Sequence, residues 1–343
     1  MSPTGSGSGG VVVLAAYRPD PELFRVQLTS IRQQTRGDFR CLVGADGGQA
    51  EVAVLVKDAV GDDDRFEVVG WDDNVGFYLN FERLLTAVPD DAGWVALSDH
   101  DDRWYPDKLE RLVPLLDRSV LVTGQARVVS APDGRVLLPK TDRRVVPAED
   151  LLLQNQVSGA LAVVRRELLD LALPFPQLRT LTQFHDHWLA VCAAATDRYL
   201  VLDEVVQDYV QHQGNEVGED GGLVSWLRRA TAHARASRDQ GGGMTAELRR
   251  FTIGWRLTMV DALARRGVGP SWPRGSRRGR ALALAMRAAR SRHVSVRVAL
   301  PMLAGAMLEW LARAPVSLPG DTVDGIPARA PSASDGEPRR AES

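Results

Sequence analysis

The apolar run at residues 11–16 is the feature that most limits how this chain can fold. It is continuous and partly β-branched, which is typical of a strand buried on both faces of a parallel sheet. Similar runs follow at residues 39–45, 66–69 and 94–97, and amphipathic helical patterns separate them. Strands that alternate with helices predict an α/β fold with an open, mostly parallel sheet flanked by helices.

Polar residues follow the ends of these predicted strands. Tyr17, Asp46, Asn74 and Asp99 each come shortly after one of them. In open α/β sheets, ligands bind outside the carboxyl ends of the strands. We therefore expect these four residues to gather at a ligand site.

The stretch that follows the fourth run holds three carboxylates, Asp99, Asp101 and Asp102. Carboxylates at alternate positions of an extended chain point to opposite sides, so Asp99 and Asp101 need a loop to converge. Oxygen ligands suit Mg²⁺ or Mn²⁺, and Mg²⁺ usually combines one or two carboxylates with waters and substrate phosphates. The stretch predicts either a divalent-metal site for a phosphate-bearing ligand or a solvated turn.

Composition excludes several classes of protein. A formal net charge of −2 over 343 residues argues against general nucleic-acid binding. The only cysteines, Cys41 and Cys192, lie in apolar sequence, so we expect buried thiols in a reducing cytoplasm and no disulfide scaffold. Residues 1–10 lack the apolar core of a signal peptide and predict a disordered lead. The longest late apolar stretch, 298–308, contains Pro301 and is too short to span a bilayer.

Two common nucleotide-binding folds are also excluded. Both need a glycine loop after the first strand, whereas Gly5, Gly7, Gly9 and Gly10 precede it. A phosphate-loop lysine motif is absent as well. The chain therefore does not predict a Rossmann dehydrogenase or a P-loop enzyme.

The rest of the chain predicts an extension of the sheet followed by helices. A helical pattern at 107–116 is followed by short strands at 120–123, 126–129 and 136–138, which suggest a mixed sheet. Further elements, which include a strand at 199–202, lead to a boundary near residue 218. Residues 219–313 are helical in pattern and rich in arginine, and the tail 314–343 has the composition of a disordered segment. We expect a catalytic domain over 11–218 with a C-terminal helical extension.

Four separated motifs resemble the family-2 glycosyltransferases of GT-A fold, particularly their bacterial rhamnosyltransferase-like branch. The first strand with Ala16-Tyr17 is similar to the family's nucleotide loop, and residues 41–48 are similar to its D-D-G turn. Residues 74–82 resemble its N-x-G and N-F-E segment, and residues 98–109 resemble S-D-Q-D-D-x-W-x-P-x-K-L, which contains the D-x-D metal motif. Downstream motifs at 155–159, 166–169, 174–176, 185–188 and 209–215 follow in the same order.

Two positions depart from the family pattern. Ala45 occupies the first position of the D-D-G turn, which leaves Asp46 alone to contact the base or ribose. His100 stands between the metal-site carboxylates, where an amide residue is common. We expect His100 to face solvent.

The resemblance implies a nucleotide-sugar and metal site. Asp101 would ligate Mg²⁺ or Mn²⁺, and Asp99 would contact the ribose or a metal-bound water. Asp102 would hold these two residues in position without contacting the metal itself. His212 would reach the metal or the diphosphate. The remaining donor-binding residues are Tyr17, Asp46, Asn74, Asn80, Ser158 and Gly159.

Several of these residues have a second interpretation. Tyr17 either stacks on the base or caps the sheet, and Asn74 and Asn80 either hold donor hydroxyls or cap local structure. Trp104 and Trp188 either form sugar platforms or pack in the core, which is the commoner place for tryptophan at such positions.

The resemblance also implies a catalytic base, Asp186. It begins a predicted helix, whose backbone N–H groups and dipole favour an ionised carboxylate. His185 and His187 would orient Asp186 or the acceptor. Deprotonation of an acceptor hydroxyl in a single displacement would invert the anomeric centre.

The function expected from these residues is metal-dependent transfer of a sugar from a nucleoside diphosphate sugar. The branch suggests dTDP-rhamnose as donor and a glycan or glycolipid of a bacterial surface polysaccharide or cell wall as acceptor. A nucleotidyltransferase is the alternative enzyme, although only Arg18 offers a basic group near the first strand. A third hypothesis is a non-catalytic scaffold that binds sugar nucleotides. The presence of Asp99, Asp101 and Asp186, which the resemblance assigns to the site, argues against it.

The late helical segment allows two interpretations. Arginines such as Arg228, Arg249 and Arg256, together with the stretch 298–308, are compatible with peripheral contact to the inner face of a membrane. Alternatively, these helices pack on the catalytic domain with solvated arginines.

Overall fold

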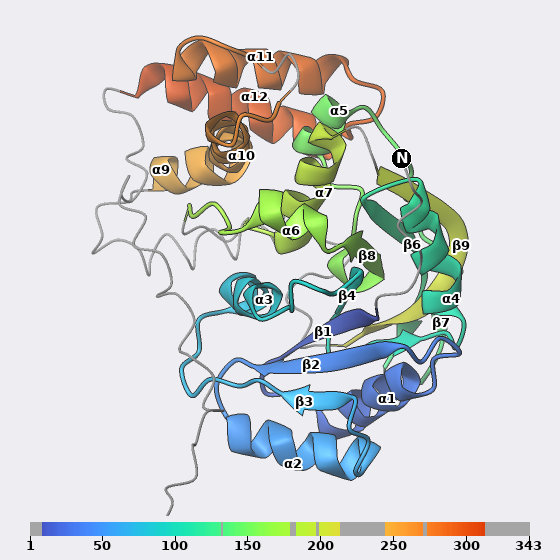
Figure 1. Cartoon of the computed structure of the whole chain (residues 1–343). Helices are drawn as coiled ribbons and strands as arrows, with labels where there is room; N and C mark the ends of the chain where they lie inside the picture. Colours follow the sequence, from blue (N-terminus) through green and yellow to red (C-terminus); the bar gives the residue numbers. More distant parts are fainter. Residues whose placement is uncertain are drawn as a thin grey trace, which may run out of the picture.

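The computed structural model describes residues 9–131, 133–178, 183–196, 199–212, 244–269 and 273–312. Its centre is a nine-stranded mixed sheet in the order β3-β2-β1-β4-β8-β6-β9-β5, with β7 paired to β6 (Figure 1). The strands are β1 (Gly10–Ala16), β2 (Phe39–Ala45), β3 (Phe66–Val68), β4 (Trp94–Ser98), β5 (Arg103–Trp104), β6 (Leu121–Ser130), β7 (Val136–Leu138), β8 (Ala162–Arg165) and β9 (Tyr199–Gln211).

The sheet combines a parallel half with a mixed half. Strands β3, β2, β1 and β4 are all parallel, as the alternation of strands and helices predicts. β8 then runs antiparallel between β4 and β6, while β6 and β9 are parallel to each other. The mixed extension expected after residue 106 is therefore confirmed.

Helices cover both faces of the sheet, with α1 and α2 on one side and α3, α6 and α7 on the other (Figure 1). The helices before the C-terminal part are α1 (Pro21–Arg32), α2 (Gln49–Val60), α3 (Phe77–Thr86), α4 (Lys108–Leu112), η1 (Val113–Asp117), α5 (Ala148–Leu153), η2 (Gly159–Leu161), α6 (Glu167–Ala172) and α7 (His185–Ala195). The first helix begins where Asp20 Oδ1 accepts hydrogen bonds from the N–H groups of Glu22 and Leu23, an ordinary N-cap.

The alternation of side chains along β1 creates two cores. Val12 and Leu14 pack with Phe24 and other residues of α1 and α2. Val11 and Val13 pack on the opposite face with α3, α7 and the C-terminal helices. Because every residue of β1 is buried, the strand is continuously apolar rather than alternating.

Some predicted boundaries differ from the structure. The two short strands expected at 120–123 and 126–129 form one bulged strand, β6, and the strand expected at 199–202 extends to Gln211 as β9. Both are long because β6 pairs with β9 over most of its length, a contact between distant segments that local patterns do not show. The helix expected at 107–116 becomes α4 followed by a 3-10 turn that contains Pro114.

The C-terminal helices pack against α3, α5 and α7. They are α9 (Met244–Arg249), the π-helical η4 (Arg250–Gly254), α10 (Trp255–Arg265), α11 (Arg277–Arg290) and α12 (Val296–Leu311). Trp255 is fully buried and meets Tyr78 of α3 edge to face, with 6.0 Å between the ring centroids. No helix within the described ranges is long and apolar enough to cross a membrane.

Three predictions about the organisation of the chain concern residues that lie partly or wholly outside the described ranges. These are the boundary near residue 218, most of the lead and the tail 314–343. Gly10, placed in the lead by its sequence, is the first residue of β1. It pairs with Phe39 and Trp94, so the sheet begins one residue earlier than expected.

Candidate active site

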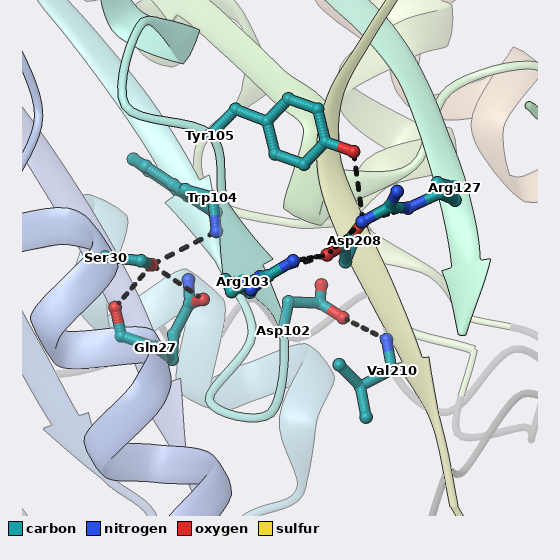
Figure 2. A network of polar contacts seen from close by, with 9 residues as sticks. All are labelled: Gln27, Ser30, Asp102, Arg103, Trp104, Tyr105, Arg127, Asp208 and Val210. Carbon is teal, nitrogen blue, oxygen red and sulfur yellow. Dashed lines mark hydrogen bonds and ion pairs between the residues drawn. The ribbon is translucent and has the colours of Figure 1, made fainter. Parts of the chain in front are cut away.

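The loop after β4 brings the three aspartates to the carboxyl end of the sheet. Asp102 is 1% exposed and accepts hydrogen bonds from Gln207 Nε2 (2.8 Å) and from Val210 N (3.2 Å), both on β9. Figure 2 shows the second of these bonds. Burial raises the pKa of Asp102 well above its ordinary range, and the Asp101 and Asp99 carboxylates raise it further. Asp102 therefore ties the acidic loop to β9.

Lys108 holds this region from a second direction. Its side chain is fully buried, and Nζ donates to Ala160 O (2.5 Å) and to Gln207 Oε1 (2.7 Å). The same Nζ lies 3.6 Å from the ring centroid of Trp104. Because burial disfavours the charged form, the pKa of Lys108 lies well below its ordinary value. Lys108 thus links β9 to the η2 turn.

Asp101 and His212 are the pair most able to hold a cation. Asp101 Oδ2 lies 2.9 Å from His212 Nε2, and both side chains are partly exposed. A carboxylate oxygen and an imidazole nitrogen are suitable donors for Mn²⁺, and the partly buried Asp99 belongs to the same loop. Among the described residues, no three His, Cys, Asp or Glu side chains form a complete metal cage. The donors therefore fit an open site whose coordination a phosphate ligand would complete.

Asp186 lies at the first turn of α7 and contacts the η2 turn. Its carboxylate accepts hydrogen bonds from Gly159 N (3.2 Å) and His187 N (2.5 Å). Burial raises its pKa from 3.8 to about 6, although these two bonds and the positive charge of Arg143 oppose the rise. A carboxylate with a pKa near 6 is ionised at neutral pH and is a better proton acceptor than an ordinary aspartate.

The two histidines beside Asp186 do not hydrogen-bond to it through their rings. His187 Nε2 lies 2.9 Å from Leu151 O, and the His185 ring stacks on Phe81 with 3.7 Å between centroids. Neither ring nitrogen of His185 has a hydrogen-bond partner among the described residues. Burial lowers the pKa of both histidines to about 3, so both are neutral at pH 7. The backbone N–H of His187, not an imidazole, orients Asp186.

Asp46 organises the loop that precedes α3. Its buried carboxylate accepts hydrogen bonds from Val75 N (2.8 Å), Gly76 N (2.9 Å) and Asn74 Nδ2 (3.1 Å). Gly76 has a positive φ of 84°, which favours glycine at this position. Asp46 and Asn74 therefore lie together, as their positions at strand ends predict, and they shape the loop beside the site.

Other predicted donor-binding residues differ in exposure. Tyr17 is 42% exposed, and the Arg18 guanidinium lies over its ring, 5.3 Å from the centroid, so Arg18 covers one face of the ring. Asn80 is buried and donates to Gly44 O (3.0 Å), which attaches α3 to β2. Ala45 is fully buried in the core under α1 and α2, which explains why an apolar residue is accommodated there. His100 is partly buried, with Nδ1 3.2 Å from Ala15 O, rather than directed wholly to solvent.

Both tryptophans of the motifs are buried, and Ser158 lies at the turn between them in sequence. Trp104 is 2% exposed, and its backbone N–H donates to Ser30 Oγ (3.1 Å; Figure 2). Trp188 is fully buried, and Nε1 donates to Ala172 O (2.8 Å). Ser158 is partly buried and its carbonyl accepts from Leu161 N (3.1 Å), which closes the η2 turn that presents Gly159 to Asp186.

A buried carboxylate on β9 braces the strand next to the acidic loop. Asp208 is 2% exposed and accepts hydrogen bonds from Arg103, Arg127 (2.7 Å) and Tyr105 (3.1 Å), as Figure 2 shows. Burial opposes ionisation of Asp208, but the bonds from the two arginines outweigh it and lower its pKa. This cluster holds β5, β6 and β9 together directly after the acidic loop.

The structure connects the acidic loop and Asp186 through one line of contacts. It runs from Asp102 through Gln207 and Lys108 to the η2 turn, where Gly159 meets Asp186. Sequence reasoning missed Gln207, Asp208 and Arg143. Lys108 lies within the motif at residues 98–109. Its fixed distance after the acidic cluster was the signal that could have predicted its role.

The open mixed sheet, with the acidic loop at the end of its fourth strand, has the architecture of a glycosyltransferase of GT-A fold. The sequence profile described as Glycosyl transferase family 2 matches residues 11–170. Residues 11–170, somewhat less than half of the chain, therefore form a family-2 glycosyltransferase domain, and the protein is an enzyme that transfers sugars.

Solved structures with a similar fold share little sequence with this chain. S. aureus TarS 1–349 in complex with UDP-GlcNAc is 13% identical, with a TM-score of 0.50 and coverage of 88% of each chain. The mannosyltransferase PcManGT from Pyrobaculum calidifontis, in complex with GDP-Man and Mn²⁺, is 17% identical, with a TM-score of 0.46 and coverage of 87% of this chain and 86% of that chain. No curated protein sequence matches this chain. The likeness to TarS shows the shared fold.

Proposed function

We propose that this enzyme transfers a sugar from a nucleoside diphosphate sugar to a hydroxyl group of a glycan or glycolipid, with inversion of the anomeric centre. The observation that carries the proposal is the contact line between the acidic loop and Asp186. Such a site has one group for the leaving diphosphate and a separate carboxylate for the acceptor hydroxyl, as a single displacement requires. The catalytic domain proposed for this reaction comprises residues 11–218.

Asp101 and His212 would hold the cation, with Asp99 beside them. When bound, Mg²⁺ or Mn²⁺ would neutralise negative charge on the leaving diphosphate. Asp101 and His212 are partly exposed, which would leave room for phosphate oxygens, and the 2.9 Å between Asp101 Oδ2 and His212 Nε2 supports a shared role of the two groups in binding the cation. Asp102 keeps this loop in place through its bonds to β9.

Asp186 would accept the proton of the acceptor hydroxyl. Its raised pKa suits this role, because the group is ionised at neutral pH yet holds a proton more firmly than an exposed aspartate. Gly159 N and His187 N fix the carboxylate in one orientation. Arg143 adds positive charge nearby, which keeps Asp186 ionised despite its burial.

The donor and the acceptor are proposed from the motifs. The rhamnosyltransferase-like motifs favour dTDP-rhamnose, and Tyr17, a partly exposed aromatic side chain that follows β1, would stack on its pyrimidine base. The acceptor class is a glycan or lipid-linked glycan of a surface polysaccharide. The buried free thiols of Cys41 and Cys192 suit a reducing compartment, where nucleotide sugars are available.

Calorimetry with a panel of nucleoside diphosphate sugars, with and without Mn²⁺, tests the donor site. We expect one donor to bind in a Mn²⁺-dependent manner and the variants Asp101→Ala and His212→Ala to lose that dependence. Asp58→Ala on the far helix α2 is the matched control and should bind as the parent does. Equal affinity of parent and Asp101→Ala with Mn²⁺ present would refute the ligand assignment.

A further inference from the structure

The outer face of α12 presents large apolar side chains to solvent. Val296 is 69% exposed, Leu300 62%, Met307 62% and Leu311 67%, at spacings of four and seven residues that place them on one side of the helix. Trp310, at 59%, lies beside them. A continuous apolar row of this kind on a folded domain marks an interaction surface more often than an isolated exposed residue does.

The other face of α12 is firmly packed, so this orientation is set by the fold. Ala299, Met302 and Ala306 are buried, and a Cβ on Gly305 would lie only 1.9 Å from Thr252 Oγ1. This close approach of α12 to η4 leaves little freedom for the helix to rotate. The apolar row therefore stays directed outward.

The surroundings of this row are strongly basic. Residues 273–312 contain eight arginines and a single acidic residue, Glu309, which is 2% exposed and binds Arg249 and Arg277. The whole chain has 42 basic and 44 acidic residues, so this excess of positive charge is local. The exposed arginines of the region are Arg274, Arg278, Arg287, Arg290, Arg292 and Arg297, of which Arg287 pairs with Glu149 and Asp150.

These arginines differ from those that the sequence pattern first pointed to. Arg249 forms a buried ion pair with Glu309, and Arg256 donates to the carbonyls of Phe251 (3.1 Å) and Leu153 (2.9 Å). Arg266 lies over the ring of Trp188 at 4.9 Å. All three arginines stabilise packing of the helices on the catalytic domain. Within the described part of residues 244–312, α11, α12 and their connection combine exposed cations with large exposed apolar groups.

We propose that α12, together with the exposed arginines around it, docks on the anionic surface of a phospholipid bilayer. The apolar row would enter the boundary between headgroups and acyl chains, as amphipathic helices do in the plane of an interface. The arginines would bind lipid phosphates through paired N–H groups. Trp310 suits the same depth, because its ring is apolar and its N–H is polar.

The helices α3, α6 and α7 lie between the pair α11 and α12 and the strands β1 and β4 (Figure 1). In Figure 1, α11 and α12 form the outer layer at one end of the molecule, and α2 lies at the other end. Docking would therefore leave the site open and near a membrane-borne acceptor. This last consequence rests on the proposed glycosyl transfer, whereas the docking rests on α11 and α12 alone.

Sedimentation of the full chain with lipid vesicles tests the proposal. We expect binding to vesicles that contain phosphatidylglycerol, weaker binding at high salt, and little binding to pure phosphatidylcholine. The double variant Leu300→Glu/Met307→Glu should reduce binding by about tenfold or more, because both apolar contacts are replaced by repelled charges. Val54→Glu on α2 replaces an equally exposed valine (60%) and should bind as the parent does.

Further readouts separate the alternatives. Arg290→Glu/Arg297→Glu should weaken binding to anionic vesicles and remove its salt dependence. Thermal melting and nucleotide-sugar calorimetry of every variant show whether the fold and the donor site persist. No binding of the parent to anionic vesicles, or equal binding of the Leu300→Glu/Met307→Glu variant, would overturn the proposal. A dimer that this variant dissociates, without vesicle binding, would also overturn it and assign the row to self-association.

Discussion

Replacement of Asp186 by asparagine should make the enzyme inactive and more stable at the same time. The buried carboxyl has a pKa of about 6, against an ordinary value of 3.8. Each pKa unit corresponds to 1.36 kcal/mol, so ionised Asp186 lowers the free energy of unfolding by at most about 3 kcal/mol. Asparagine carries no charge to bury. However, Gly159 N and His187 N donate to different oxygens of Asp186, so the single oxygen of asparagine can accept only one of them, and the lost bond offsets about 1 kcal/mol of this gain.

The pH dependence of this effect follows from the direction of the pKa shift. Below pH 3.8 the carboxyl is protonated in both folded and unfolded chains, so the stabilisation by asparagine should vanish. It should grow as pH rises toward 6 and stay constant above that value. Urea unfolding of parent and Asp186→Asn at pH 4 and pH 8 measures the difference.

The kinetic half of this prediction uses the same variant. Loss of a general base should lower kcat by about 10²- to 10⁴-fold while donor affinity changes little. For the parent, kcat/KM should rise with pH through about 6 and then level off. Asp58→Asn, an exposed carboxylate on α2, should change neither stability nor rate. An Asp186→Asn enzyme that is less stable at pH 8, or that retains its activity, would refute the assignment.

Three further predictions concern the groups around the site. Arg143→Gln removes a positive charge that lowers the pKa of Asp186, so the acidic limb of kcat/KM should move to higher pH; an unmoved limb would contradict this. Gly159→Ala would place a Cβ 2.4 Å from His185 Nε2, so the η2 turn must shift and kcat should fall by about tenfold or more, with donor binding by calorimetry as the control. Asp208→Asn should lower the free energy of unfolding in urea by about 2 kcal/mol at pH 7, because two arginines lose their buried carboxylate. Since the pKa of Asp208 is lowered, this difference should persist down to its ordinary value of 3.8 and shrink only below it; a difference that disappears near pH 6 would contradict this account.

Local sequence was sufficient to predict the parallel half of the sheet. β2 begins and ends at the predicted residues, and β1 and β4 differ from prediction by one residue each. These strands are buried on both faces, so the chain shows an uninterrupted apolar run for each, and the following loops must carry the polar residues. The acidic loop after β4 could be located for the same reason.

The mixed half of the sheet required the tertiary structure. β6 and β9 are separated by the whole of α5 to α7, and their pairing extends β9 to Gln211. That extension brings Gln207 and Asp208 beside the acidic loop and His212 beside Asp101. Polar residues within a strand have no local signature of this role, because their partners come from distant segments.

The sequence by itself determined the fold class, the position of the acidic loop and the family that residues 11–170 resemble, since these depend on local apolar runs and on motifs of fixed spacing. Only the tertiary structure decided which polar groups are buried and which face solvent. It made Asn80, Trp188 and Arg256 packing residues, gave Asp186 its raised pKa through burial, and left the apolar row of α12 exposed. Burial depends on contacts between remote segments, and those contacts exist only in the folded chain.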